Sequence, residues 1–171
     1  MNSKIRGFTL IELMLTVIVA AILLSVAIPS FRTFIQNNQL TTATNQFVTA
    51  LNLTRSEAVK RGRSVRISAL SPSGSNEWGG GFMVWIDENG DGTYDASDDQ
   101  QLRRWDALDG NMTVDSNNGR TLFIYDGDGV VNAGDTVDVC DSGRSGETGR
   151  RLAIDVTGRI SISDDSYSGC S

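Results

Sequence analysis

The sequence predicts an α+β protein in which one long N-terminal helix is followed by a head of antiparallel strands. Three observations support this class: a nearly uninterrupted apolar run over residues 8–28, a helical period that persists to about residue 61, and alternating apolar and polar residues beyond residue 63. We therefore divide the 171 residues into four parts, which are 1–7, 8–28, 29–62 and 63–171.

The apolar run FTLIELMLTVIVAAILLSVAI is long enough to cross a bilayer, for which about 20 helical residues suffice. Lys4 and Arg6 precede it, which predicts that the N-terminus stays in the cytoplasm while the rest of the chain is exported. A secretory signal fits less well, because the run is long and contains an acid, Glu12. The small residues around Ser25 and Ala27 nevertheless leave a conventional cleavage site open.

The charge of Glu12 is costly inside a membrane. A lone carboxylate there costs about 2.5–3.5 kcal/mol on insertion scales, more than a simple anchoring helix would carry without a partner. A positive group on a neighbouring chain would offset this cost, because opposite charges in a low dielectric reduce each other's desolvation penalty. Glu12 is therefore a candidate functional residue.

Gly7 followed by FTLIEL resembles the cleavage motif of type IV prepilins and type II secretion pseudopilins. The resemblance implies the type IV pilin fold, cleavage between Gly7 and Phe8 by a prepilin peptidase, and N-methylation of Phe8. It also implies that Glu12, fifth in the mature chain, compensates the charge on a neighbouring subunit's N-terminus during assembly. Pro29, at the end of the apolar run, matches the proline at the kink or melted stretch of many pilin helices.

A helical period continues past Pro29 to about Arg61, which predicts one helix of roughly 80 Å. Apolar or small residues recur in it at every third or fourth position, and they predict a face that packs on the head. These residues are Leu40, Ala43, Phe47, Ala50, Leu51, Thr54 and Ala58. Gly62 is a candidate C-terminal cap for this helix.

The Arg-Ser-Glu-Ala segment at residues 55–58 resembles the end of the long helix in GspH/FimT-type minor pilins and pseudopilins. This resemblance favours a minor subunit over a major pilin. Through the segment WGGGFMVWID and the acidic turn after it, the resemblance also implies a head of two sheets.

Alternation and turn residues predict seven strands in the head. They are Val65–Leu70, Gly81–Ile86, Gln101–Trp105, Thr121–Tyr125, Thr136–Cys140, Arg151–Val156 and Arg159–Ser163. The last two, joined by Thr157 and Gly158, read as a hairpin. Strands at this spacing suggest antiparallel sheets packed on each other, with the long helix against one face.

The chain has no histidine and only two cysteines, Cys140 and Cys170. This excludes histidine-based acid/base catalysis and four-cysteine zinc sites, and no other pattern resembles a catalytic site, so we predict no enzyme. Both cysteines lie in the part expected to be periplasmic, where disulfides form. We expect a bridge that contributes about 3–4 kcal/mol, with two free thiols as the alternative.

The acidic segment DENGDGTYDASD carries a candidate calcium site. Oxygen-bearing side chains fall at the alternate positions of an EF-hand-like loop, with Gly92 at the sharp turn. The candidate ligands are Asp87, Asn89, Asp91, Asp95 and Asp98. The short acid at the last position and the strand-like flanks depart from that motif, and an acidic hairpin tip is the alternative.

DNA uptake is a further function among FimT-like minor pilins, where the resemblance points to a C-terminal Gly-Arg-x-Arg stretch. Here Ser161 replaces the second arginine. The candidate DNA-binding residues are Arg144, Arg150, Arg151 and Arg159. The net charge of −6 and five acids in the same tail oppose the positive field that phosphate binding requires, so solvated surface arginines are the favoured interpretation.

These features predict a minor pilin of the GspH/FimT group that takes part in type IV pilus assembly at the tip. The expected partners are other minor and major pilins, the prepilin peptidase, the inner-membrane assembly platform and, before assembly, membrane lipid. We expect a single-pass inner-membrane protein with a periplasmic head that later joins the fibre. Pseudopilin H of a type II secretion system is the alternative, and a DNA-binding minor pilin ranks below it. No cofactor is predicted apart from the candidate calcium ion.

Overall fold

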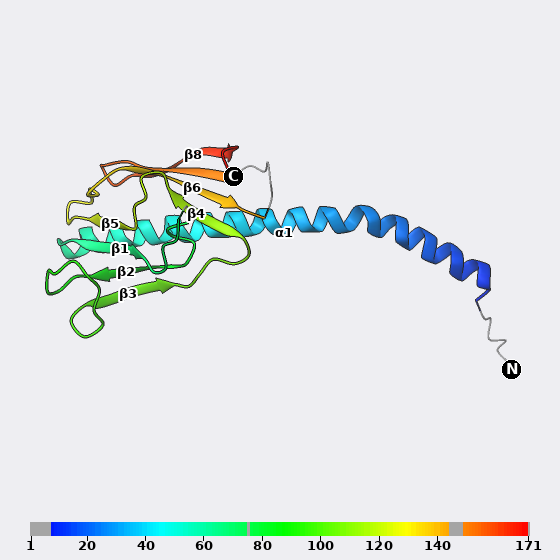
Figure 1. Ribbon diagram of the computed structural model, residues 1–171, viewed down its shortest axis with the longest axis horizontal. Helices are drawn as coiled ribbons and strands as arrows, with labels where there is room; N and C mark the ends of the chain where they lie inside the picture. The colour runs from blue at the N-terminus through cyan, green and yellow to red at the C-terminus, as the bar shows by residue number, and fades with distance from the viewer. Residues whose placement is uncertain (1–7, 75, 144–148, 171) are drawn as a thin grey trace. The chain divides into compact units, whose positions relative to one another are not determined.

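The computed structural model describes residues 8–74, 76–143 and 149–170, and consists of one helix, α1 (Leu10–Arg61), followed by eight strands (Figure 1). The strands are β1 (Val65–Ala69), β2 (Phe82–Ile86), β3 (Gln100–Trp105), β4 (Met112–Ser116), β5 (Leu122–Tyr125), β6 (Asp135–Asp141), β7 (Gly149–Ile154) and β8 (Ile160–Tyr167). The chain forms two compact units, Met1–Asn38 and Gln39–Ser171. We call the second unit the head.

The first turn of α1 is capped by Thr9, a feature that our sequence analysis missed. Thr9 Oγ1 accepts the backbone N–H of Glu12 at 3.3 Å, and the Thr9 carbonyl accepts the N–H of Leu13 at 3.2 Å. Thr9 and Glu12 have the spacing of a capping box, and the negative charge of an acid in the first turn also interacts favourably with the helix dipole. Farther along, α1 continues through Pro29 without interruption, so the chain is not melted there.

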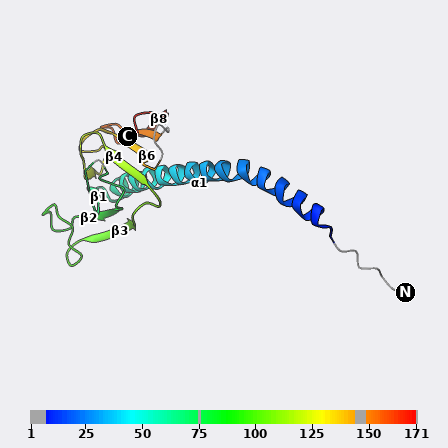
Figure 2. The same ribbon diagram turned by 45° about the vertical axis from the view of Figure 1, so that its right-hand side comes forward.

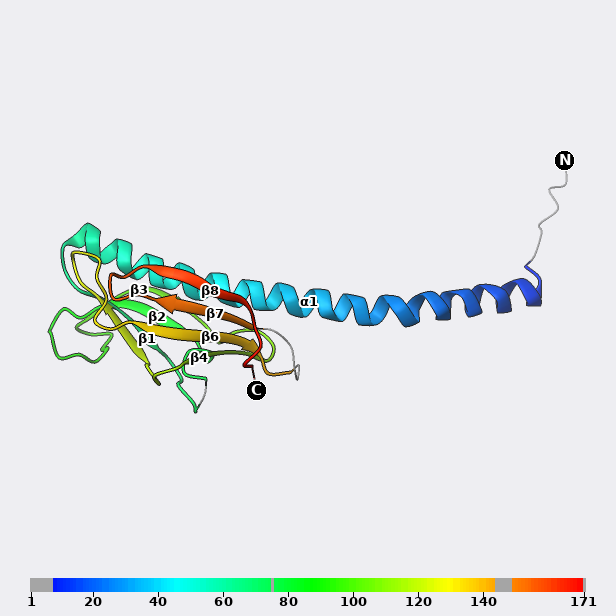
Figure 3. The same ribbon diagram turned by 90° about the horizontal axis from the view of Figure 1, so that it is seen from above.

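The head contains two four-stranded antiparallel sheets, with strand orders β3-β2-β1-β5 and β4-β6-β7-β8. Strands β2 and β3 of the first sheet lie below the head portion of α1 in Figures 1 and 2, and β8 of the second sheet lies above it. Figure 3 shows β6, β7 and β8 side by side. The predicted antiparallel two-sheet head is therefore confirmed.

Two details differ from the sequence prediction. Strand β4 was missed, because its five residues MTVDS are few and include a charged one, Asp115. The predicted hairpin forms, with Ala153 paired to Ser161, but β8 extends past its predicted end at Ser163 to Tyr167. Local alternation did not reveal this extension because the second half of β8 is polar and acidic.

The predicted inner face of α1 is buried at all seven positions. Phe47 lies at the centre of this face, and the centroid of its ring is 5.2 Å from that of Trp78 and 5.4 Å from that of Phe82. Trp78 in turn stacks on Phe123 of β5 at 5.4 Å. The same core includes residues of the second sheet such as Leu152, so α1 and both sheets share one apolar interior.

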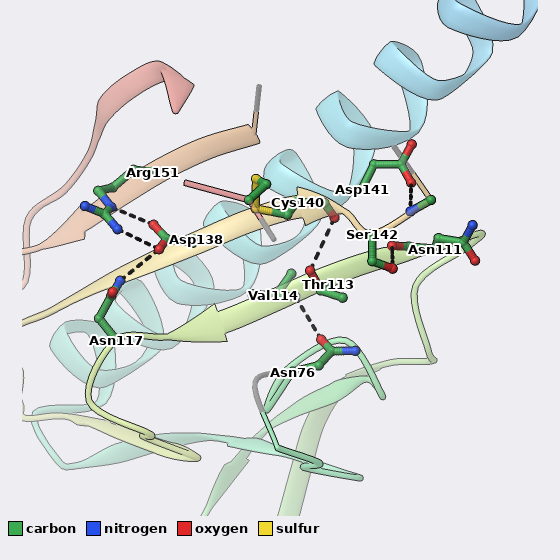
Figure 4. The surroundings of a disulfide bond; sticks show 12 residues. Asn76, Asn111, Thr113, Val114, Asn117, Asp138, Cys140, Asp141, Ser142 and Arg151 are labelled. Carbon is green, nitrogen blue, oxygen red and sulfur yellow. Dashed lines mark hydrogen bonds and ion pairs between the residues drawn. A yellow bond between two sulfur atoms is a disulfide. The ribbon is translucent and has the colours of Figure 1, made fainter. Parts of the chain in front are cut away.

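The connection between β1 and β2 joins the two sheets by covering the outer edge of β4. The N–H of Trp78 donates to the Val114 carbonyl at 3.0 Å, and Asn76 Oδ1 accepts the Val114 N–H at 2.9 Å (Figure 4). Glu77 Oε2 accepts the buried N–H of Ser116 at 2.9 Å. An edge that would otherwise expose unpaired backbone groups is thereby satisfied within the head.

Cys140 on β6 and Cys170 beyond β8 form a disulfide with their Cα atoms 5.7 Å apart, which confirms the predicted bridge (Figure 4). The bridge passes over Gly149, the first residue of β7. A Cβ atom on Gly149 would collide with Cys170 Sγ and would lie 2.5 Å from the Val139 carbonyl oxygen. The disulfide and the β6–β7 pairing together require glycine at this position.

We predict that Gly149→Ala lowers the free energy of unfolding by about 1–3 kcal/mol, because the added methyl group overpacks a site closed by backbone on one side and sulfur on the other. Urea unfolding of the oxidised protein measures the change. In a Cys140→Ser/Cys170→Ser background the substitution should cost less, since one of the two colliding groups becomes smaller. An equal cost in both backgrounds would contradict the role of the disulfide in this collision.

We predict that the head gains stability through Asp115 as the pH falls from neutral. Burial, followed by a hydrogen bond to Glu77 and the charges of Glu77, Asp138 and Asp135, raises the pKa of Asp115 from 3.8 to about 6. Because the folded-state pKa is the higher one, this stabilisation is complete below about pH 4 and is lost as the pH rises through 6.

Urea midpoints at about pH 4.5 and 7.5 measure this difference. Wild type should gain more stability at the lower pH than Asp115→Asn does. Asp109→Asn, an exposed acid elsewhere in the head, is the control and should behave as wild type. Equal pH dependence of wild type and Asp115→Asn would contradict the prediction.

Candidate functional site

The predicted processing and assembly residues surround the start of α1. Gly7 lies outside the described residues, and Phe8, just before the helix, is 82% exposed. α1 is long and apolar enough to cross a membrane, and none of its apolar 18-residue window is buried in the protein. Large side chains such as Ile11 and Leu15 are exposed. A surface of this kind requires cover from lipid or from another protein.

Glu12 is the one acid in this apolar surface, and no other charged residue occurs in the sequence between Arg6 and Arg32. Its position at the third residue of α1 combines two roles. The acid completes the sequence pattern of the capping box begun by Thr9, and it places a carboxylate on the exposed surface of the helix. Such a carboxylate can accept an ammonium group from another chain.

The Arg-Ser-Glu-Ala segment fastens the end of α1 to the head. Arg55 Nε donates to the Gly129 carbonyl at 3.1 Å, and its Nη2 donates to the Thr157 carbonyl at 3.2 Å. One side chain therefore joins the helix to the β5–β6 loop and to the β7–β8 turn. Glu57 pairs with Arg61 at 2.8 Å, and this bond holds the pKa of Glu57 below its ordinary value.

The candidate calcium loop is held by its own backbone and by an arginine. Asp87 Oδ1 accepts the N–H of Gly90 at 2.7 Å, and Oδ2 accepts the N–H of Gly92 at 3.0 Å. Oδ2 also lies 2.7 Å from Arg66 Nη2. The first predicted ligand is therefore already bonded through both oxygens, one of them to a cation.

The next two acids of the loop follow the same pattern. Asp91 Oδ1 accepts the N–H of Thr93, and Asp95 Oδ1 accepts the N–H of Ser97, both at 2.8 Å. These backbone hydrogen bonds are the main reason why the pKa values of Asp91 and Asp95 lie below their ordinary value. The arrangement is that of successive Asx turns.

The loop is closed by Asp99, which the sequence analysis did not select. Its carboxylate accepts the N–H of Glu88 at 3.0 Å and of Asp95 at 2.8 Å, whereas Asp98 is exposed. Asn89 Oδ1 accepts the Asp91 N–H at 3.0 Å. Within the described residues, no group of three acids, cysteines or histidines is placed to hold a metal ion. Calcium binding stays a prediction.

The candidate DNA-binding arginines do not converge. Arg144 lies outside the described residues. Arg150 Nη2 donates to Thr41 Oγ1 on α1 at 3.2 Å. Its neighbour Arg151 forms two bonds of 2.6 and 2.7 Å with Asp138 (Figure 4). Burial raises the pKa of Asp138, but the hydrogen bonds from Arg151 and Asn117 and the positive charge of Arg151 together lower it overall.

Arg159 is exposed and lines an open groove of about 770 Å³ that also contains Asp135 and Asp155. Arg150 and Arg151 are consecutive on β7, so their side chains leave opposite faces of the sheet. The described arginines thus belong to three different settings, and two of these include acids. DNA binding stays a prediction.

Comparison with known proteins places these features in a family. The family model "Type II transport protein GspH" matches residues 43–158, and the model "Prokaryotic N-terminal methylation motif" matches residues 2–28. Two fimbrial proteins of Pseudomonas aeruginosa are similar in sequence. One is 30% identical over 95 residues, 56% of this chain and 61% of the relative, and the other is 29% identical over 101 residues. The chain spans about three fifths of the length of these curated relatives.

Two solved structures share the fold. The type IV minor pilin FimU of P. aeruginosa has a TM-score of 0.66 at 24% identity, covering 81% of this chain and 99% of FimU. The minor pseudopilin EpsH from the Type 2 Secretion System of Vibrio cholerae has a TM-score of 0.52 at 12% identity, covering 78% of this chain and 99% of EpsH. The long N-terminal helix of this chain, packed on antiparallel sheets, therefore has the type IV pilin fold. The chain belongs to the GspH family of minor pilins and pseudopilins.

Proposed function

We propose that this protein is a minor pilin, a structural subunit that is cleaved between Gly7 and Phe8 and enters a type IV pilus. The observation that carries the proposal is the isolated acid Glu12, which lies in the first turn of an exposed apolar helix and within the residues matched by the methylation motif. This charge has no role in a helix that only anchors a protein in lipid, whereas in an assembling subunit it can pair with a positive group on a neighbouring subunit.

The physical reason lies in the new chain end that cleavage creates. An α-amino group is positively charged, and moving it from the membrane surface into a bundle of apolar helices carries a desolvation cost of several kcal/mol. Glu12 of a neighbouring subunit would supply the opposite charge at the same depth. Each charge would then reduce the cost of burying the other, and the pairing would also set the register between subunits.

A pilus is the preferred assembly because the sequence relatives are fimbrial proteins and the fold superposes better on FimU than on EpsH. A type II secretion pseudopilus is the second candidate, favoured by the description of the matching family model. The role is structural in either case. The chain has no histidine, and its two cysteines are used in a disulfide.

In this proposal the segment 8–28 spans the inner membrane and the head is periplasmic, where the Cys140–Cys170 bridge can form. The prepilin peptidase and the inner-membrane assembly platform are the partners before assembly. Other minor and major pilins are the partners within the fibre, and their helices replace lipid around the apolar half of α1.

We predict that Glu12→Gln leaves cleavage after Gly7 intact but lowers the amount of this subunit in sheared fibres by about tenfold or more. Glutamine keeps the capping box with Thr9, so the change removes the charge without removing the helix start. Mass spectrometry of the N-terminus and quantitative immunoblotting of the fibre fraction measure the two effects.

Glu12→Asp, which keeps the charge, is the control and should retain most of the incorporation. A native chain that still begins at Met1, or normal incorporation of Glu12→Gln, would overturn the proposed function. The protein would then be a tethered periplasmic β-domain.

A further inference from the structure

Each sheet of the head has one covered edge and one open edge. The edge of β4 is covered by the β1–β2 connection. The edge of β5 is covered by Asn132, whose N–H donates to the Ile124 carbonyl at 2.9 Å and whose Oδ1 accepts the Ile124 N–H at 3.0 Å. Among the described residues, no backbone hydrogen bond joins the outer side of β3 or of β8 to another segment. Figures 1 and 2 both show β3 as the outermost strand of the first sheet.

The two open edges carry opposite charges. Strand β8 contains Asp164 and Asp165, in keeping with the net charge of −6 of the chain. Strand β3 contains two consecutive arginines instead, Arg103 and Arg104, and both are exposed. The edge of β3 is therefore a basic site on an acidic protein, and it is complementary to an acidic partner.

Arg103 has an aromatic partner but, within the described part of the chain, no carboxylate partner. Its guanidinium carbon lies 4.7 Å from the centroid of the Trp105 ring, and that ring lies 5.4 Å from the ring of Phe82. Arg66 of the same sheet, by contrast, is bonded to Asp87 at 2.7 Å. A guanidinium that lies on an aromatic face is held in place while its N–H groups stay available to a ligand.

Arg104 projects from the opposite face of β3, because the side chains of successive strand residues alternate. It pairs with Asp106 at 3.4 Å, but the two side chains are 53% and 92% exposed. Such a pair contributes little, so a better-placed carboxylate can replace Asp106. Arginine and tryptophan are also the residues that most often dominate binding energy at interfaces. The β3 edge thus has one available cation on each face of the sheet.

The backbone of Arg104 also faces outward. The Leu70 N–H donates to the Gly81 carbonyl at 2.9 Å, so at the next position Phe82 directs its backbone groups toward β3. Trp105, which is opposite Phe82, is therefore hydrogen-bonded to β2. The residue before it, Arg104, directs its N–H and C=O away from β2, where a further strand can bind them.

A β-bulge limits the length of this edge. Val84 pairs with Arg103, whereas Trp85 pairs with Gln101, so Leu102 is an extra residue of β3. Bulges interrupt pairing at sheet edges. The regular part of the edge therefore begins at Arg103, and it fits a short segment in a reversible contact.

We infer that the β3 edge binds a short, extended, acidic segment of another protein, which adds to the first sheet as a further strand. Two consecutive acids of that segment pair with Arg103 and Arg104, one on each face of the sheet. The backbone of the segment bonds the N–H and C=O of Arg104. The inference does not depend on the proposed function, because it involves neither Glu12 nor the N-terminal half of α1.

A nucleic acid fits the same edge less well. A base can stack on an exposed aromatic ring beside arginines. However, Asp99 directly precedes β3 and Asp106 directly follows it, so a phosphate chain that runs along the strand meets negative charge at both ends. A polypeptide with only two acids at its centre avoids both of these charges.

Fluorescence anisotropy with the full-length chain in detergent micelles tests the inference. The probe is a labelled synthetic peptide in which alternating valine and threonine residues flank a central pair of glutamates. We expect saturable binding that Arg103→Gln/Arg104→Gln weakens by about tenfold or more. Arg159→Gln, which removes an exposed arginine just before β8, is the matched control and should bind as wild type. A peptide with two lysines in place of the glutamates should not bind.

N-methylated peptides separate strand addition from charge attraction. Methyl groups on the backbone nitrogen of every second residue block one edge of the peptide and leave the other edge free. Of two such peptides, methylated on opposite edges, one should bind about tenfold more weakly and the other as the unmodified peptide does. Equal binding of the two methylated peptides would overturn the inference.

Three further results would also overturn it. They are failure of the unmodified glutamate peptide to bind, tighter binding of a thymidine oligonucleotide than of that peptide, and dimerisation of the chain alone that Arg103→Gln/Arg104→Gln abolishes in sedimentation. The last two would assign the edge to nucleic acid or to a second copy. Formation of the Cys140–Cys170 bridge, seen on non-reducing gels, verifies that each variant folds.

Discussion

One helix must satisfy two different surroundings, and this constraint shapes the whole protein. The N-terminal half of α1 carries apolar side chains in all directions, which suits lipid or a bundle of similar helices. The head half places an apolar stripe on one side only, where Phe47 and Leu51 are fully buried. The stripe gives the two sheets a common core. The change of environment therefore corresponds to a change in the spacing of the apolar residues along one continuous helix, α1.

Several acidic side chains of the head are hydrogen-bonded or ion-paired to groups close to them. The loop after β2 directs its carboxylates onto its own backbone N–H groups, and Arg66 neutralises Asp87. On the second sheet Arg151 donates two hydrogen bonds to Asp138, and its guanidinium also lies 4.0 Å from the centroid of the Tyr167 ring. Charges that look like binding determinants in the sequence thus act largely as structural ties. Within the part of the chain that the structure describes, the carboxylate of Glu12 has no such bond.

The Arg-Ser-Glu-Ala segment illustrates how a family motif can be explained by contacts. Arg55 bonds two carbonyls on separate connections, Ala58 is fully buried, and Glu57 pairs within the last turn. A lysine could not replace Arg55 here, because its single ammonium group lacks the planar fork of donors that lets a guanidinium bond both carbonyls. Arg55 therefore fixes the end of the helix to the head at two points.

The sequence by itself determined the long helix, its buried face, most of the strands and the pairing of the two cysteines. These features rest on local period, and on the number and expected compartment of the cysteines, and each is readable without knowing what lies nearby. The tertiary structure decided what depends on distant neighbours. Examples are strand β4 with its covered edge, the bonding of Asp87 to Arg66 and the dispersal of the tail arginines. A short polar strand or an isolated charge gains its meaning only from the groups that folding brings within hydrogen-bond distance, and sequence separation does not reveal them.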